Sequence, residues 1–246
     1  MANIPILDGC TLFGPWPQHA ADLSVESLLA TMAHNGIVRS MATATTGIFY
    51  DYRQGNAETL GVAKQHPQQL FPVATLDPRA YPECLQEAEA RAAEGFRMFR
   101  FFPERQGWPL RFAPFRDLLQ KCDELGVLVA VTTAHAGDIT AIADEVAFTR
   151  APLLLAGVTS RHLGEALSVM KNDPKFYMET TGLLAPGALE SVCECIDKGA
   201  ERLIFASYSP LRYLSTALAP VLSAALSDED KTLILGGNLK RLLTKQ

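Results

Sequence analysis

The sequence lacks the features of several large classes of protein. Its 246 residues include only five cysteines, an odd number scattered along the chain, which fits reduced thiols better than a disulfide framework. No apolar run approaches the roughly 18 residues that a membrane span needs, and the N-terminus shows no basic region followed by an apolar one, as a secretory signal would. These absences predict a cytoplasmic protein that does not enter a membrane.

Positive charge is scarce as well. The chain has 22 Lys and Arg against 27 Asp and Glu, a formal net charge of -5, and its basic residues form neither a cluster nor a helix face. This argues against nucleic acid or an anionic membrane as a partner. The expected partner is therefore a small molecule, anionic or hydroxylated, with homo-oligomerisation left open. The sequence predicts no cofactor.

The dominant pattern is an alternation of short β-branched runs with longer amphipathic segments, which is typical of βα units around a parallel sheet. Eight units in a chain of this length predict a single-domain (β/α)₈ TIM barrel over residues 1–246. An open doubly wound sheet would more often carry a glycine-rich phosphate loop, and GxGxxG and GxxxxGK[ST] are both absent. The predicted strands cover residues 4–10, 37–44, 71–76, 96–102, 127–133, 152–157, 175–181 and 202–207.

Capping signals mark several of the intervening helices. Ser24 is placed to cap a helix that Gly36 would end in the left-handed conformation. A second helix over residues 112–126 would end in the same way at Gly126. The last helix is predicted to begin near Asn238 as its N-cap.

The order of the motifs resembles that of a known family. The segments ILDGCTLFG, HNGIVRSMA, FPVATLDPR, EGFRMFRFFPE, LGVLVAVTT, APLLLAGV, LIFASYSP and ILGGNLKRLL follow one another along the whole chain. In this order they resemble the amidohydrolase superfamily, in particular its single-domain branch of small metal-dependent hydrolases and decarboxylases. The resemblance implies the same (β/α)₈ barrel, with working residues at the carboxyl ends of the strands.

Members of that superfamily generally hold one or two divalent metals. Their ligands are a His-x-His after the first strand, single histidines after the fifth and sixth, and an aspartate after the eighth. The resemblance matches these positions to Cys10 and Leu12, then Thr132, Gly157 and Tyr208. Leu12 and Gly157 offer no side-chain donor, and hydroxyls are poor zinc ligands. The sequence therefore predicts that the metal site is absent and that these positions cluster at one end of the barrel.

Charged residues near two strand ends suggest a different site. Arg97 and Arg100 are three apart in one strand, so only one of them can face the barrel interior, and the resemblance favours Arg100. An interior guanidinium can anchor a substrate carboxylate or form an internal ion pair with Glu179. Glu179 in turn is a candidate base, or it simply neutralises Arg100.

Other strand ends supply nucleophiles, imidazoles and hydroxyls. Cys10 is a candidate nucleophile that His162 or His135 would activate, although a free cysteine is commonly a small buried residue. The predicted substrate-binding residues are Arg100, Thr132, Tyr208, His135 and Thr45. The threonines have the alternative explanation of simple strand propensity.

Three functions remain compatible with these residues. The first is a metal-independent hydrolase or lyase that acts on a small carboxylate-bearing substrate, with Glu179, His162 and Cys10 as catalytic groups. The second is a catalytically inactive pseudoenzyme that binds a small molecule or a partner protein. The third is a metal-dependent hydrolase with relocated ligands. An enzyme should show a titratable group beside space for a reacting atom, whereas a binding protein needs only a polar pocket.

Overall fold

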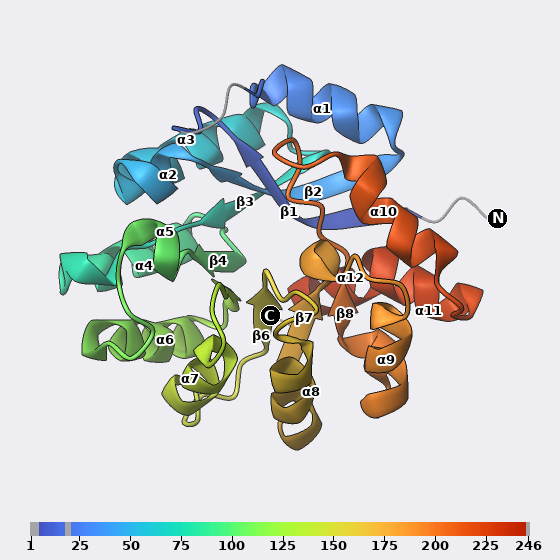
Figure 1. The fold of residues 1–246 in the computed structure, drawn as a ribbon. Coiled ribbons are helices and arrows are strands. Elements are labelled where there is room, and N and C mark those ends of the chain that lie inside the picture. Colours follow the sequence, from blue (N-terminus) through green and yellow to red (C-terminus); the bar gives the residue numbers. More distant parts are fainter. Residues whose placement is uncertain (1–4, 18–20, 245–246) are drawn as a thin grey trace.

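The computed structural model describes residues 5–17 and 21–244. Eight parallel strands pair in sequence order and helices surround them, so the predicted TIM barrel is confirmed (Figure 1). The strands are β1 Ile6–Phe13, β2 Ile37–Ala44, β3 Leu70–Ala74, β4 Met98–Phe101, β5 Leu128–Thr132, β6 Leu153–Ala156, β7 Phe176–Glu179 and β8 Leu203–Ile204.

Most helices form the outer layer, and the short α2 and α5 directly follow β2 and β4. No helix in the described ranges combines the length and the apolar character needed to cross a bilayer. The helices are α1 Val25–His34, α2 Thr46–Phe49, α3 Tyr52–Gln65, α4 Glu83–Ala93, α5 Pro103–Gln106, α6 Ala113–Leu125, α7 Asp138–Glu145, α8 Leu163–Asn172, α9 Ala188–Cys195, α10 Leu214–Ser223, α11 Asp228–Thr232 and α12 Asn238–Thr244.

The first strand differs from its prediction. Residues 4–10 were expected, but β1 continues to Phe13 because Leu12 and Phe13 pair with Thr43 and Ala44 of β2. Residue 4 lies outside the described residues. The other seven strands lie at their predicted places to within one or a few residues, and β8 is much shorter than expected. The extension of β1 places Leu12, like Cys10, inside the sheet.

The helix ends follow their capping signals, with one exception. The Ser24 hydroxyl accepts a hydrogen bond from the Ser27 N–H at 3.1 Å, and Gly36 and Gly126 have φ of 71° and 65°, as predicted. The last helix, α12, begins at Asn238 as predicted, but Asn238 has helical φ and ψ of -67° and -47° and is therefore not its N-cap. Its side-chain amide instead donates to the Leu203 carbonyl at 2.9 Å and ties α12 to β8.

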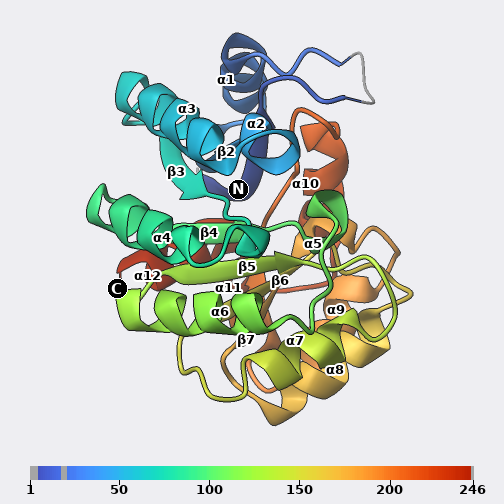
Figure 2. The same ribbon diagram turned by 90° about the vertical axis from the view of Figure 1, so that its left-hand side faces the viewer.

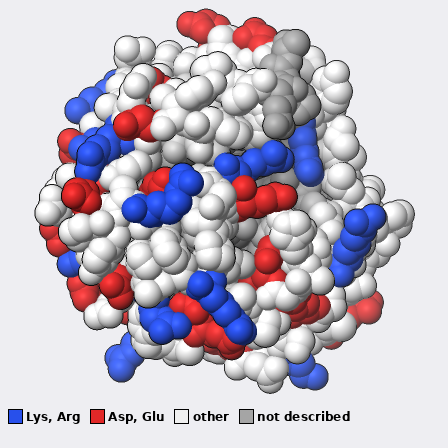
Figure 3. Space-filling view, turned by 60° about the vertical axis from the view of Figure 1, so that its left-hand side comes forward, with Lys and Arg blue, Asp and Glu red and all other residues white. Residues whose placement is uncertain are grey.

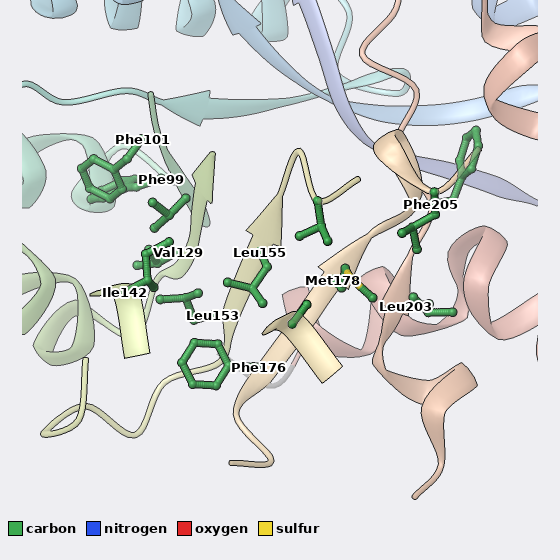
Figure 4. Packing of buried hydrophobic residues seen from close by; sticks show 14 of the residues in the cluster. Phe99, Phe101, Val129, Ile142, Leu153, Leu155, Phe176, Met178, Leu203 and Phe205 are labelled. Atoms are coloured by element: carbon green, nitrogen blue, oxygen red, sulfur yellow. The ribbon is translucent and has the colours of Figure 1, made fainter. Parts of the chain in front are cut away.

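Side chains alternate between two cores. In β4, Phe99 and Phe101 point outward into the layer between strands and helices, part of which Figure 4 shows. Met98 belongs to the inner core, where Leu239 and Leu242 of α12 close the amino end of the barrel. Figure 2 shows α12 beside the tails of the strands and α5 near their carboxyl ends. The carboxyl end is therefore the end left open for a site.

The barrel closes where the chain that follows β8 runs along β1. Gly9 N–H donates to the Phe205 carbonyl at 2.8 Å, and Tyr208 N–H donates to the Cys10 carbonyl at 2.9 Å. Beside this seam, the fully buried Asp8 accepts hydrogen bonds from the Cys10 and Ser207 amides, at 3.0 and 2.9 Å, and from the Ser207 hydroxyl. A carboxyl group thus sits in the closure of the barrel.

Asp8 should make the stability of the fold depend on pH. Burial raises the pKa of Asp8 to about 7, the hydrogen bonds from Ser207 and Cys10 oppose this shift, and Glu179 adds to it. Because the folded-state pKa lies above that of the unfolded chain, stabilisation is full at low pH and is lost as the pH rises through about 7. We expect the unfolding free energy to fall by about 2.5 kcal/mol between pH 5 and pH 8 from this group.

Asp8→Asn is the matched control, because its amide accepts the same N–H bonds, donates to the Ser207 hydroxyl and does not titrate. Urea denaturation of both proteins at the two pH values measures the effect. The variant should be the more stable protein at pH 8. The same pH dependence in both proteins would contradict the assignment.

Candidate active site

A pocket of about 290 Å³ lies at the carboxyl ends of the later strands. Most of its walls come from β5 to β7 and from the loops that follow β4, β5, β6 and β8. Its polar and charged lining residues are Glu104, Arg105, Thr132, Thr133, Thr159, His162, Glu179, Thr181, Tyr208 and Arg212. The position agrees with the general rule for TIM barrels. It brings together four of the predicted site residues, namely Thr132, His162, Glu179 and Tyr208.

An ion pair between Arg100 and Glu179 lies beneath this pocket, with each side chain only 1% exposed. Two guanidinium nitrogens of Arg100 donate to the two carboxylate oxygens of Glu179, and one of them also donates to the Gly9 carbonyl at 3.0 Å. Burial lowers the pKa of Arg100, but Coulombic interactions with Cys10 and Glu179 raise it more, so the group stays charged. Arg97 is exposed. The inward orientation of Arg100 and its pairing with Glu179 are thus both observed, while direct contact of Arg100 with a ligand stays a prediction.

Two other predicted residues lie outside the pocket wall. Cys10 is 1% exposed, and burial raises the pKa of its thiol. Because the thiolate is the reactive form, this environment disfavours a nucleophilic role. Thr45 is fully buried and its hydroxyl donates to the Pro15 carbonyl at 2.9 Å, which holds the loop that follows β1. Both side chains are therefore packed behind the pocket wall and do not line the pocket.

The two candidate histidines have different environments. His162 is 9% exposed and lines the pocket, and its Nδ1 lies 3.5 Å from the Thr159 hydroxyl. The side chain of His135 is 71% exposed, and its Nε2 lies 3.8 Å from Glu104 at the rim. Only His162 is therefore in the pocket wall, as a group that could exchange a proton with a bound molecule.

The positions matched to the superfamily's metal ligands come together, as predicted, but they do not fit a metal. Thr132, Gly157 and Tyr208 line one pocket, next to the Cys10 carbonyl. Gly157 has φ of 75°, and a β-carbon there would lie 2.9 Å from the Thr133 carbonyl oxygen, so the backbone does not admit a histidine. No three His, Cys, Asp or Glu side chains in residues 5–17 and 21–244 are placed to hold a metal ion.

An apolar cluster occupies the other first-strand position. Leu12 is fully buried and packs in a cluster with Trp16 and Phe102, which also lines the pocket. Tyr208 packs against the same cluster, with its ring centroid 6.3 Å from that of Trp16. Its φ of 61° is costly for a bulky residue, and such strain is found most often at functional sites.

Sequence reasoning missed two arginines of the pocket. Arg105 belongs to α5, and its guanidinium lies 5.6 Å from the Trp16 ring. Arg212 follows β8 and donates to the Thr181 carbonyl at 3.0 Å. Both occupy segments after strand ends, which was the available signal, but charged residues are common on such surfaces. On the face shown in Figure 3, positive and negative side chains intermingle.

One buried hydroxyl in the pocket wall has no partner. The Thr132 oxygen accepts and donates no hydrogen bond within the described residues. A buried polar group without a hydrogen bond costs free energy. A polar group or water that reached this oxygen would therefore be favoured at the end of β5.

Comparison with known proteins gives both a family and a fold. The sequence model of a family described as amidohydrolase matches residues 11–244. An uncharacterised TIM-barrel protein from Bordetella bronchiseptica shares 19% identity, with 95% of this chain and 86% of that chain covered and a TM-score of 0.76. The 5-carboxyvanillate decarboxylase of Sphingomonas paucimobilis shares 14% identity, with 98% and 99% covered and a TM-score of 0.77.

A third solved structure contains a metal. It is the dihydroxybenzoic acid decarboxylase of Polaromonas sp. JS666 with bound manganese and 2-nitroresorcinol, which shares 13% identity, with 98% and 97% covered and a TM-score of 0.77. At these identities the three structures support the fold. No curated protein matches the sequence significantly.

The Arg100–Glu179 pair should be far more important to stability than a surface pair. Glu179→Leu leaves the guanidinium buried without its carboxylate, so we expect a loss of about 3–5 kcal/mol in the free energy of unfolding. The double variant Arg100→Met/Glu179→Leu should recover most of this loss, because no charge is then left unpaired.

The exposed pair Arg111–Asp144, with side chains 67% and 58% exposed, is the matched control. Arg111→Met should change stability by less than about 1 kcal/mol. Urea denaturation of all four proteins makes the comparison. If Glu179→Leu cost no more than Arg111→Met, the buried pair would not be the structural element described.

Proposed function

The chain belongs to the amidohydrolase family, and we propose that it is a metal-independent hydrolase or lyase that acts on a small carboxylate-bearing substrate in the cytoplasm. The observation that carries this proposal is the charge of the pocket. Two arginines, Arg105 and Arg212, line the pocket. Of the two acidic residues in its described lining, Glu179 is neutralised by its ion pair with Arg100, so only Glu104 balances the charge of the two arginines.

A site with this balance is locally positive in a protein of net charge -5. Guanidinium groups bind carboxylates through paired hydrogen bonds. The volume of about 290 Å³ suits a small molecule. Two of the similar structures are named as decarboxylases of carboxylated aromatic compounds, which supports the same substrate class here. Phe102 and Tyr208 give the pocket the apolar surface that such a molecule needs.

His162 is the residue we assign to proton transfer. Imidazole exchanges protons near neutral pH, and the Thr159 hydroxyl lies 3.5 Å from the Nδ1 of His162. In a hydrolysis, the ring would take a proton from the attacking water and return it to the leaving group. Thr132 would meet a polar atom of the substrate with its unpartnered hydroxyl. Arg105 and Arg212 would hold the carboxylate and stabilise developing negative charge.

Metal independence follows, within this proposal, from the unsuitable donors at the five matched positions. Leu12 is apolar and buried, Gly157 has no side chain, and the thiol of Cys10 is held neutral by burial. The alternative of relocated metal ligands has no supporting cluster among the described residues. The chemistry is therefore assigned to the imidazole, the arginines and the hydroxyls of the pocket.

A second candidate function is binding without turnover. It is favoured by the state of two predicted catalytic groups. Both oxygens of Glu179 accept hydrogen bonds from Arg100, and Cys10 lies outside the pocket wall. A pseudoenzyme would keep the carboxylate-binding pocket and lack catalysis. The two candidates therefore agree on binding and differ only in turnover.

Carboxylate binding is tested by calorimetry with a panel of hydroxybenzoates, 5-carboxyvanillate and carboxylated lactones. For a ligand that binds, Arg212→Met should weaken the affinity by about 1.5–3 kcal/mol, the range for a hydrogen bond to a charged group. Arg53→Met, which changes an exposed arginine of α3, should leave the affinity unchanged. Equal affinity for the wild type and for both Arg105→Met and Arg212→Met would reject the pocket as the carboxylate site.

Turnover is tested with the ligands found in this way. His162→Gln should lower kcat by about 10²–10⁴-fold, the contribution typical of a general acid or base, and leave ligand affinity nearly unchanged. Arg212→Met should raise KM and also lower kcat, because this arginine is proposed both to hold the carboxylate and to stabilise developing negative charge. Binding by the wild type without any product would select the pseudoenzyme. Turnover that is unaffected by His162→Gln would remove His162 from the mechanism.

A further inference from the structure

A second and larger pocket, of about 710 Å³, opens at the amino end of the barrel. Its apolar lining includes Leu7, Met41, Phe71 and Leu243. Met41 is 1% exposed, whereas the other three are only partly buried against the inner core. The inner core and α12 thus form the floor of a cavity that is open to solvent. Apolar surface gathered in such a concave site is typical of ligand binding.

The charged residues of this pocket are all positive. Arg39, Arg97 and Lys240 line it, and no described Asp or Glu does. The Arg39 guanidinium lies 3.9 Å from the centre of the Phe71 ring and donates to the Gln68 carbonyl at 2.9 Å, so it is fixed over the apolar lining. Arg97 and Lys240 are exposed and form none of the ion pairs found among the described residues. Cations therefore surround an apolar cavity.

The lining suits binding better than catalysis. The described lining residues include no histidine, cysteine, serine or carboxylate that could act as a nucleophile or base. The site is also separated from the first pocket by the inner core, with Met98, Leu128 and Leu154 between the two ends of the barrel. A molecule bound here would not reach the residues proposed for turnover.

We propose that this pocket binds an amphiphilic carboxylate, a molecule with an alkyl chain and one anionic end. The chain would lie against Leu7, Phe71 and Leu243, and the carboxylate would meet Arg97 and Lys240. Charge complementarity selects this ligand class, because a neutral alkyl compound would leave Arg97 and Lys240 without an anionic partner and a small anion would leave the apolar lining exposed to water.

The test is calorimetric titration with octanoate, decanoate and 1-decanol. Decanoate should bind about tenfold more tightly than octanoate, since each buried methylene contributes a constant increment, and about tenfold more tightly than 1-decanol, which lacks the charge. Arg97→Ala and Lys240→Ala should each weaken decanoate binding by about five- to tenfold. The exposed Arg53→Ala is the matched control and should have no effect.

A variant that fills the cavity gives an independent measurement. Leu243→Trp should abolish decanoate binding while circular dichroism and the melting temperature show a folded protein. Arg105→Met, in the first pocket, should leave decanoate binding unchanged, so failure here is distinguishable from failure of the proposed function.

Three results would overturn the proposal. They are no decanoate binding by the wild type, decanoate binding by Arg97→Ala and Lys240→Ala that is as tight as that of the wild type, and binding of 1-decanol as tight as that of decanoate. Concentration-dependent dimerisation of the free protein that Leu243→Trp abolishes would also overturn it, because a second copy of the chain would then be the occupant.

Discussion

A charged pair buried inside the barrel, Arg100 with Glu179, is the constraint on which the rest of the site depends. It joins β4 to β7, and through the Gly9 carbonyl it also reaches β1. Burying both charges away from water costs free energy, and only the close contact between the two groups offsets that cost. The guanidinium of this pair interacts electrostatically with Cys10, one of the positions that the resemblance matches to a metal ligand. The pair itself is neutral, so the positive charge of the barrel mouth comes from Arg105 and Arg212.

The two ends of the barrel offer different side chains to a ligand. At the carboxyl end, the internal pair leaves Arg105, Arg212 and His162 as the groups available to a bound molecule. At the amino end, the inner core reaches the surface as an apolar cavity edged by cations. The inner hydrophobic core therefore separates the polar pocket at the carboxyl end, where we propose catalysis, from the apolar pocket at the amino end, where we propose ligand binding.

The barrel was predicted well because hydrophobic periodicity and capping residues depend on interactions between residues that are close in sequence. The alternation of strand and helix periods gave the eight units, and Ser24, Gly36 and Gly126 marked helix ends through backbone conformations that each prefers. Asn238 was rightly placed at the start of the last helix but is not its N-cap, because its own backbone is already helical, which the residue type alone does not reveal. The end of β1 was missed because its last residues are paired by β2, a contact distant in sequence.

The site was predictable only where strand parity decides. Parity and the resemblance placed Arg100 inside, with Glu179 as one of two alternative partners, and the structure shows the pair with Glu179. They did not separate His162 from His135, because loop geometry decides which imidazole reaches the wall. Arg105 lies in the short helix α5 and Arg212 in the loop after β8, and their only signal was a position after a strand end, which many charged surface residues share.

The central proposal, that this chain works without a metal and has a buried ion pair and apolar packing at the barrel mouth instead, is tested most directly by elemental analysis. The protein would be purified without chelator, dialysed against manganese or zinc, freed of excess metal and measured for metal per chain. The account predicts a ratio far below one for each metal and a melting temperature that chelation does not change. A ratio near one, lost together with stability on chelation, would contradict it.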